Sequence, residues 1–185
     1  VVAPFRRFPD SVPVTDGDGI REKDGKKLIV KWLTYPSRQE LPLLAESAQS
    51  TLKNIGMAVD INNTADNNQV VKDPKKWDVY AMANVQAPTG DPEYWFTVFA
   101  VSNATKNQGK YHSAKLDALE QQLSQEFDPA KRAALAVQMQ QTVLDDNAFV
   151  FCSFLKMSMI SKKNIKNYTS HACDYYQVTA DLDVE

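Results

Sequence analysis

The sequence predicts an α/β protein in which helices flank a central mixed sheet. Short apolar stretches near residues 28–33, 57–61, 79–84 and 149–155 have the length and bounding turn residues of strands. Between them, longer stretches repeat apolar residues at helical spacing. The first strand, helix and second strand form a β-α-β unit, which implies a parallel pair and a right-handed crossover. Together these observations predict a layered α/β fold.

Composition limits the function classes. The 185 residues are 43% hydrophobic and 24% charged, with a net charge of −2, which is typical of one substantial globular domain or two small ones. No basic stripe is present, so we expect no nucleic-acid partner. No apolar run is long enough to span a membrane. Because Val1 is not a natural start residue, we interpret the chain as a mature product or an excised fragment.

The first β-α-β unit is the clearest pattern in the chain. The helix is expected from about Glu40 to Ile55, with Pro42 in its first turn, where a missing N–H costs little. Gly56 is typical of the position just after a helix. One apolar face is predicted to consist of Leu41, Leu44, Ala45, Ala48, Leu52 and Ile55.

The stretch from Trp77 to Asp91 is where a ligand site is expected. An apolar run, Val79 to Ala83, ends in a polar loop that contains Pro and Gly, and Asp91-Pro92 then signals a helix start. In open α/β sheets, ligands bind beside loops at the carboxyl ends of strands. Everything else in the chain can be interpreted as a frame for this loop.

The second half is predicted to be mainly helical. A short helix after Pro92 carries aromatic residues all round, so we expect Phe96 and Phe99 in the core and weigh Tyr94 and Trp95 equally between core and cleft. Helices follow at 114–126 and 129–145. The second has Asp128 as N-cap and Pro129 in its first turn, and Leu135, Met139 and Val143 packed inward. The apolar run from Ala148 to Leu155 is interpreted as a fully buried strand, with Cys152 as a small core residue.

Each residue that could bind a metal or an anion also has a purely structural interpretation. Asp16 and Asp18 are spaced as in a calcium loop, but Ile20 and Lys27 stand where ligands are required, so we favour glycine turns before a strand. His112 is either an exposed turn residue or a metal ligand. Arg38, just ahead of a helix, is either solvated or able to hold an anionic group.

No pattern supports catalysis. The sequence has neither a Gly-rich phosphate loop nor a nucleophile elbow, and His112 and His171 are far apart. Asp145-Asp146 is interpreted as a solvated helix end rather than an acid/base pair. Whether Cys152 pairs with Cys173 stays open. We therefore expect a protein that is not an enzyme and carries no resident cofactor.

Several collinear motifs resemble the C-terminal lobe of the family 5 extracellular solute-binding proteins, the oligopeptide, dipeptide and nickel receptors of ABC importers. Each motif is weak alone, but their order matches over nearly the whole chain from Asp16 onward. The matching stretches are 16–28, 35–42, 52–61, 77–78, 90–92, 107–111, 116–119 and 128–132.

This resemblance implies one lobe of a type II periplasmic-binding-protein fold that closes on its ligand by a hinge. We expect residues 1–25 to be an inter-lobe linker or crossover remnant, 26–160 the C-terminal ligand-binding lobe and 161–185 a return segment. It also implies an ABC-transporter permease and the protein's own N-terminal lobe as partners. The implied location is the periplasm, or a lipid-anchored position at a Gram-positive cell surface. Ser11 to Val14 departs from the family pattern, which has a helix ending in Gly-Trp there.

The resemblance favours the nickel-type branch. In the oligopeptide receptors the loop carries a Trp and an Asp that pairs with the peptide amino terminus, whereas Asn84 and Ala87 stand here. Burying an ammonium group without that carboxylate is costly. The implied cargo is nickel or a nickel chelate. The alternatives are a peptide receptor of the same family and, from another class, a stand-alone enzyme or interaction domain. The expected ligand-binding residues are Arg38, Asn84, Val85, Gln86, Thr89, Tyr94 and Trp95, with His112 as the nearest metal ligand.

Overall fold

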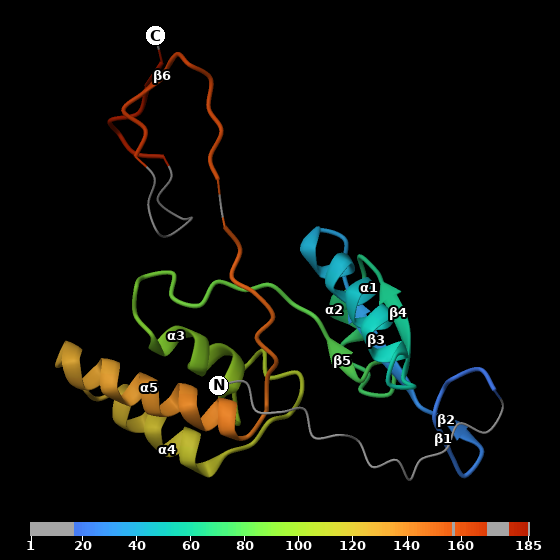
Figure 1. Ribbon diagram of the computed structural model, residues 1–185. Helices are drawn as coiled ribbons and strands as arrows, with labels where there is room; N and C mark the ends of the chain where they lie inside the picture. The colour runs from blue at the N-terminus through green and yellow to red at the C-terminus, as the bar shows by residue number, and fades with distance from the viewer. Residues whose placement is uncertain (1–16, 157, 170–177, 185) are drawn as a thin grey trace. The chain divides into compact units, whose positions relative to one another are not determined.

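The computed structural model describes residues 17–156, 158–169 and 178–184 (Figure 1). The chain divides into two compact units, residues 1–84 and residues 85–185, and each is described by itself. Among the described residues, no helix is both long and apolar enough to cross a membrane.

The first unit is a parallel three-stranded sheet. Strand β3 (Ile29–Thr34) lies in the centre, between β4 (Ala58–Asn63) and β5 (Val79–Tyr80), and both neighbours run parallel to it. The register pairs Ile29 with Ala58 and Trp32 with Val79. The β-α-β unit and its parallel pair are therefore confirmed. Helix α2 (Asn67–Val70) is a single turn between β4 and β5.

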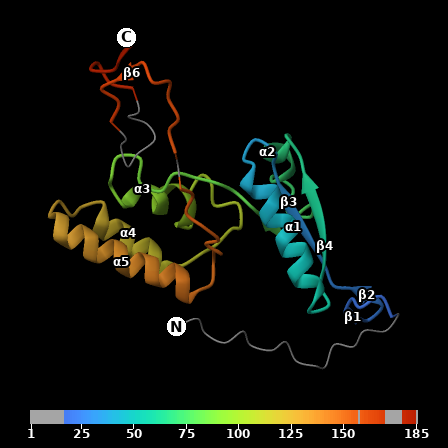
Figure 2. The ribbon, with the colours of Figure 1, turned by 45° about the horizontal axis from the view of Figure 1, so that its top comes forward.

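Helix α1 (Glu40–Lys53) lies against the sheet formed by β3 and β4 (Figure 2). Leu41 and Ala45 of its predicted apolar face are buried, whereas Ile55 lies beyond the end of the helix and is exposed. The Gln49 amide donates to the carbonyl of Val59 at 2.8 Å. Gly56 follows with a φ of +79°, and a Cβ there would meet the Arg21 side chain at 2.7 Å. Glycine is therefore required for both its backbone conformation and its lack of a side chain.

The glycine turns expected before the first long strand are present. Strands β1 (Glu22–Lys23) and β2 (Lys26–Lys27) form an antiparallel hairpin. Asp24 and Gly25 connect them, both with positive φ, as a type I′ turn requires. Asp18 accepts a hydrogen bond from the Ile20 N–H at 2.8 Å and pairs with the ammonium group of Lys27. A lysine partner fits a structural carboxylate and not a calcium ligand; Asp16 lies outside the described residues.

The second unit is built on helices. Helix α3 (Glu93–Trp95) continues into a π-helical turn, η1 (Phe96–Ala100), and α4 (Ala114–Leu123) and α5 (Pro129–Asp145) lie side by side (Figures 1 and 2). The Asp128 side chain caps α5 by accepting from the Lys131 N–H at 2.9 Å, as predicted. The core of the α4–α5 pair consists of residues that are all buried, namely Leu116, Leu119, Leu123, Ala136, Met139 and Val143.

Three expectations for strands and core need correction. The sheet strand expected at 79–84 is only β5, because after Ala81 the chain leaves the ladder and the Ala83 N–H donates to the Tyr35 hydroxyl instead. Residues 149–155 are not a strand, and Val150 and Phe154 are 87% and 79% exposed. Cys152 within this run is also exposed, and Cys173 lies outside the described residues.

The physical reason is that an apolar run signals a need for burial without specifying the partner. In the described part of the chain, the parallel sheet contains only β3, β4 and β5, with no antiparallel strand to make it mixed. The expected fourth strand is not part of this sheet. Two other short strands, β6 (Ile165–Lys166) and β7 (Asp183–Val184), pair with each other antiparallel.

Candidate ligand-binding loop

Side chains, more than sheet pairing, fix the chain where β5 ends. Strand β5 continues into one further ladder bond, from the Ala81 N–H to the Leu33 carbonyl at 2.9 Å. The Tyr80 hydroxyl accepts from the Asn67 side chain at 2.8 Å, and burial is the main cause that raises the pKa of Tyr80. The Tyr35 hydroxyl then accepts from the Ala83 N–H at 3.1 Å. The start of the candidate loop is thus held by polar contacts of two tyrosines.

The loop itself, residues 84–90, presents polar side chains to solvent. Asn84, Gln86 and Thr89 are exposed, whereas Val85 is half-buried. A turn closes the far side of the loop, where the Gly90 N–H donates to the Ala87 carbonyl at 3.0 Å and Gly90 has a φ of +81°. The predicted lining residues therefore include two amides and a hydroxyl group, which can donate to an anionic ligand or accept from a cationic one.

An arginine from α5 holds the carboxyl end of this loop. Arg132 Nη2 donates to Asp91 Oδ1 and Oδ2 at 2.8 and 2.7 Å, and to Glu93 Oε2 at 2.8 Å. Arg132 Nη1 donates to the carbonyls of Leu123 and Glu126, both at 2.7 Å. We call these five groups the Arg132 network. It joins the loop end, the start of α3 and the end of α4 to helix α5.

Asp91 is held in its charged form by the same geometry. Its carboxylate accepts the Glu93 N–H at 2.8 Å, and this hydrogen bond, followed by those from Arg132, lowers the pKa of Asp91 despite partial burial. An ionised Asp91 at the start of a helix also interacts favourably with the helix N-terminus. The loop end therefore keeps its charge-assisted contacts at neutral pH.

The aromatic residues after the loop form a cluster. Trp95 is 7% exposed, and its ring lies 5.4 Å from that of Phe96, 5.2 Å from Phe149 and 5.5 Å from Phe151, measured between centroids. Phe96 and Phe99 are buried, as expected. This environment gives Trp95 a structural role, whereas Tyr94 is only half-buried. That either residue contacts ligand stays a prediction.

His112 is part of a polar chain of side chains. Its Nδ1 lies 2.6 Å from Ser102 Oγ, and Ser102 in turn donates from Oγ to Asp117 Oδ2 at 2.6 Å. Because Ser102 uses its single hydroxyl proton on the carboxylate, its oxygen accepts from His112 Nδ1–H. The neutral imidazole then carries its lone pair on Nε2. In this tautomer Nε2 has the lone pair that a metal ligand needs, and the His112 side chain is exposed.

The remaining predicted residue, Arg38, is exposed between β3 and α1, where its carbonyl accepts from the Leu41 N–H at 3.1 Å. It belongs to the first unit with Asn84, whereas Val85 to Thr89, Tyr94, Trp95 and His112 belong to the second. In the described ranges, no group of three or more His, Cys, Asp or Glu side chains is placed to hold a metal ion.

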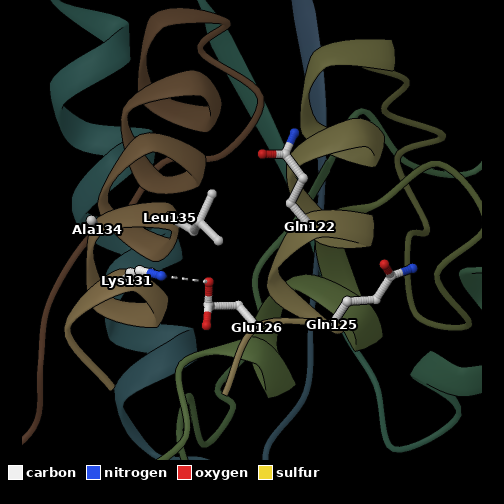
Figure 3. Close-up of a pocket in the computed structure, with 6 residues that line it drawn as sticks. All are labelled: Gln122, Gln125, Glu126, Lys131, Ala134 and Leu135. Atoms are coloured by element: carbon white, nitrogen blue, oxygen red, sulfur yellow. Dashed lines mark ion pairs between the residues drawn. The ribbon is translucent and has the colours of Figure 1, made fainter. Parts of the chain in front are cut away.

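A separate hollow lies between the end of α4 and the start of α5 (Figure 3). Lys131 and Glu126 face each other across it, with their charged atoms 3.9 Å apart. An exposed ion pair at this distance contributes little. The hollow is lined by Gln122, Gln125, Glu126, Lys131, Ala134 and Leu135, and it is open to solvent as ordinary protein surface is.

The sequence did not reveal the residues that support the end of the loop 84–90 and the residues that support His112. Arg132 and Asp91 lie in the motifs 128–132 and 90–92, which were used for the family resemblance and not for chemistry. Their pairing spans 41 positions, so no local pattern reveals it. Ser102 and Asp117 were likewise found only through the fold that brings them to His112.

The fold defines a class of protein. No family model matches the chain. The structure resembles a nickel ABC transporter protein of Bacillus halodurans, with a TM-score of 0.67 and 27% identity, over 90% of this chain and 35% of that one. It also resembles NikA of Staphylococcus aureus in complex with Ni(L-His)2, with a TM-score of 0.70 and 22% identity, over 85% of this chain and 34% of that one. These are type II periplasmic-binding-protein folds, which confirms the predicted fold class.

Curated sequences give the relatives. The chain is 26% identical over 141 residues to the nickel-binding protein NikA of Staphylococcus aureus, covering 76% of this chain and 29% of that protein. It is 26% identical over 160 residues to the oligopeptide-binding protein AppA of Bacillus subtilis, covering 85% of this chain and 29% of AppA. The chain is thus homologous to a nickel-binding protein and to an oligopeptide-binding protein, the two kinds of relative that its motifs predict. It spans about 30% of the length of these relatives, which is consistent with a single lobe.

Proposed function

We propose that this chain is the C-terminal lobe of the substrate-binding component of an ABC importer, and that it captures nickel or a nickel chelate for uptake. The observation that carries the proposal is the loop 84–90, which offers neutral polar groups and has Asn84 and Ala87 where a peptide receptor needs Trp and Asp. The similarity to nickel-binding proteins of two bacteria supports the same ligand class.

The residues suit a chelated metal better than a bare ion. Amide groups of Asn84 and Gln86 and the hydroxyl of Thr89 can hydrogen-bond to the carboxylates and amines of a small chelator. In the proposed role, His112 offers an imidazole nitrogen, a donor that suits nickel, and Ser102 fixes its tautomer. One imidazole leaves most coordination positions to the chelator. The protein would act as a receptor outside the cytoplasm and deliver its cargo to a membrane permease without chemical turnover.

Peptide capture is the second candidate, because the chain is also 26% identical to AppA. The loop argues against peptide binding in the usual manner of oligopeptide receptors. An ammonium group enclosed without a carboxylate partner loses several kcal/mol of solvation, roughly 3 or more. With alanine at position 87, no side chain there supplies the compensating charge.

Calorimetry with nickel and L-histidine tests the proposal. We expect submicromolar binding by the longest natural form of the protein, which in the proposal contains both lobes. The 185-residue chain is expected to bind at least about a thousandfold more weakly, since one lobe keeps part of the contacts and cannot exclude water from them; a loss of about 4 kcal/mol gives this factor. Submicromolar nickel binding by the 185-residue chain would mean that a complete site lies within it, contrary to the lobe assignment.

Two substitutions in the long form locate the site. Gln86→Ala and His112→Ala should each weaken binding of the nickel–histidine complex. Gln121→Ala, which removes an exposed glutamine on α4, is the matched control and should leave affinity unchanged. A long form that binds an unmodified tetrapeptide and ignores nickel–histidine would support the peptide alternative instead.

A further inference from the structure

We infer that Arg132 is a positioning residue for ligand capture: through Asp91 it fixes the carboxyl end of the loop 84–90 in the conformation that receives the ligand. The inference rests on the proposed function for its effect on affinity. Its structural half, the control of the loop by an arginine on a distant helix, stands on contacts in the second unit alone.

The first step is the geometry of the guanidinium group. Its Nη2 donates to two carboxylates, those of Asp91 and Glu93, and its Nη1 donates to two main-chain carbonyls. Those carbonyls, of Leu123 and Glu126, lie at the end of α4 and just beyond it, where helix carbonyls lack intrahelical partners. Because each of these hydrogen bonds is directional, the group holds three segments in fixed relative positions.

The second step is burial. The Arg132 side chain is only 17% exposed, compared with 71% for its neighbour Lys131. A partly buried arginine with two carboxylates is less screened than a surface pair, so its contacts hold the loop end more strongly. A lysine at this position could not replace it, because a single ammonium group cannot reach both carboxylates and both carbonyls.

The third step connects the network to the ligand loop. The loop ends at Asp91, which the Arg132 guanidinium group holds within the second unit. Gln86 and Thr89, the exposed groups proposed to meet the ligand, lie five and two residues before Asp91. Releasing Asp91 removes this constraint, so the loop samples more conformations and a smaller fraction is competent to bind.

The competing view is that Arg132 only ties α4 to α5. The two views predict different places of loosening. If Arg132 acts on the loop, hydrogen exchange should increase at Gly90 and Glu93, whose N–H groups donate to the Ala87 carbonyl and to the Asp91 carboxylate, and affinity should fall. If it acts only on the helices, exchange should increase within α4 and α5 while the loop and the affinity stay as in the wild type.

The experiment compares Arg132→Ala, Arg132→Lys and Asp91→Asn with Lys131→Ala. Lys131→Ala removes one positive charge from the adjacent position of the same helix and is the matched control. Hydrogen exchange is followed without ligand on the 185-residue chain, and affinity for nickel–histidine is measured on the longest natural form. Arg132→Ala should speed exchange in the loop and weaken binding, each by roughly tenfold, as expected for loss of charge-assisted hydrogen bonds.

The conservative variants complete the test. Arg132→Lys should recover only part of both effects, and Asp91→Asn combined with Arg132→Ala should lose no more than Arg132→Ala alone, because both act through one contact. These milder variants decide the question if Arg132→Ala does not fold. Wild-type loop exchange in Arg132→Lys and Asp91→Asn would overturn the inference. A faster loop in a protein whose wild type ignores nickel–histidine would uphold the positioning role and refute the proposed function.

Discussion

The two compact units reach their shapes by different means. In the first, main-chain ladders carry the architecture: β3 pairs with β4 along six residues and with β5 along two. In the second, single side chains fasten the loops between helices, among them Asn107, Asp117 and Arg132. A ladder distributes its strength over many equivalent bonds. Where a single side chain holds a loop, the stabilisation depends on that one residue. The effect of point substitutions on stability should therefore differ between the two units and from residue to residue.

The largest expected effect tests which apolar residues of the second unit stabilise it. Met139 is fully buried in the α4–α5 core, whereas Val150 is 87% exposed in the run once expected to be a strand. Met139→Ala should lower the free energy of unfolding by about 3 kcal/mol through lost packing and a cavity. Val150→Ala should change it by less than about 0.5 kcal/mol. Urea denaturation measures both, and a comparable loss in Val150→Ala would show that this run is buried in solution.

Replacing a side chain that holds a loop by hydrogen bonds should lower stability nearly as much as replacing a core residue. Asn107 is 5% exposed, its amide donates to the Val101 and Tyr111 carbonyls at 3.2 and 2.7 Å, and its oxygen accepts from the Tyr111 N–H at 2.9 Å. Asn107→Ala removes the Asn107 side-chain partner of the Tyr111 N–H and carbonyl, whereas the Val101 carbonyl still accepts from the Ala104 N–H at 2.9 Å. We therefore expect a loss of about 2 kcal/mol. Asn103→Ala, at an exposed position four residues earlier, is the control. Equal stability of the two variants would argue that the loop does not depend on Asn107.

What could be predicted from the sequence follows the same division. Periodic patterns indicated α1, α4, α5, β3 and β4, because helix and strand faces repeat locally. Cap residues such as Asp128 and Gly56 were also recognised, since their role depends on near neighbours. The apolar run 149–155 was misassigned, because its hydrophobicity does not reveal whether a sheet edge lies beside it.

The candidate site was predictable as a place and not as a mechanism. The strand-end loop followed from the order of elements and from the family resemblance. Its supports, Arg132 with Asp91 and Ser102 with His112, join residues 41 and 10 positions apart and depend on the tertiary fold. The sequence also could not place Trp95, because its aromatic pattern fits both a cleft residue and the buried position that it occupies.

The capping of α5 provides a smaller test within the second unit. Asp128 accepts from the Lys131 N–H, a group that has no partner within the helix. Asp128→Ala should lower stability by about 1 kcal/mol, whereas Asp128→Asn, which keeps an accepting oxygen, should lose much less. Thermal unfolding of the two variants measures the difference. If alanine and asparagine are equivalent, the cap contributes nothing, and α5 depends on its apolar face alone.

The smallest expected effect separates two carboxylates of the second unit by the sign of their pH dependence. Burial raises the pKa of Glu120, and the nearby charges of Glu93 and Asp117 raise it further, whereas the pKa of Asp91 is lowered. Glu120 therefore favours the folded state most below its ordinary pKa of 4.5, and this contribution is lost as the pH rises through the folded-state value. Asp91 contributes above its ordinary pKa of 3.8 and loses its contribution as the pH falls through its lower folded-state value.

Glu120→Gln should consequently stabilise the protein at pH 7, by no more than about 0.5 kcal/mol, and the gain should vanish below pH ~4. Asp91→Asn should destabilise it at pH 7, with the difference shrinking in acid. Denaturation curves between pH 3 and pH 7 would contradict this account if both variants shifted stability in the same direction at neutral pH.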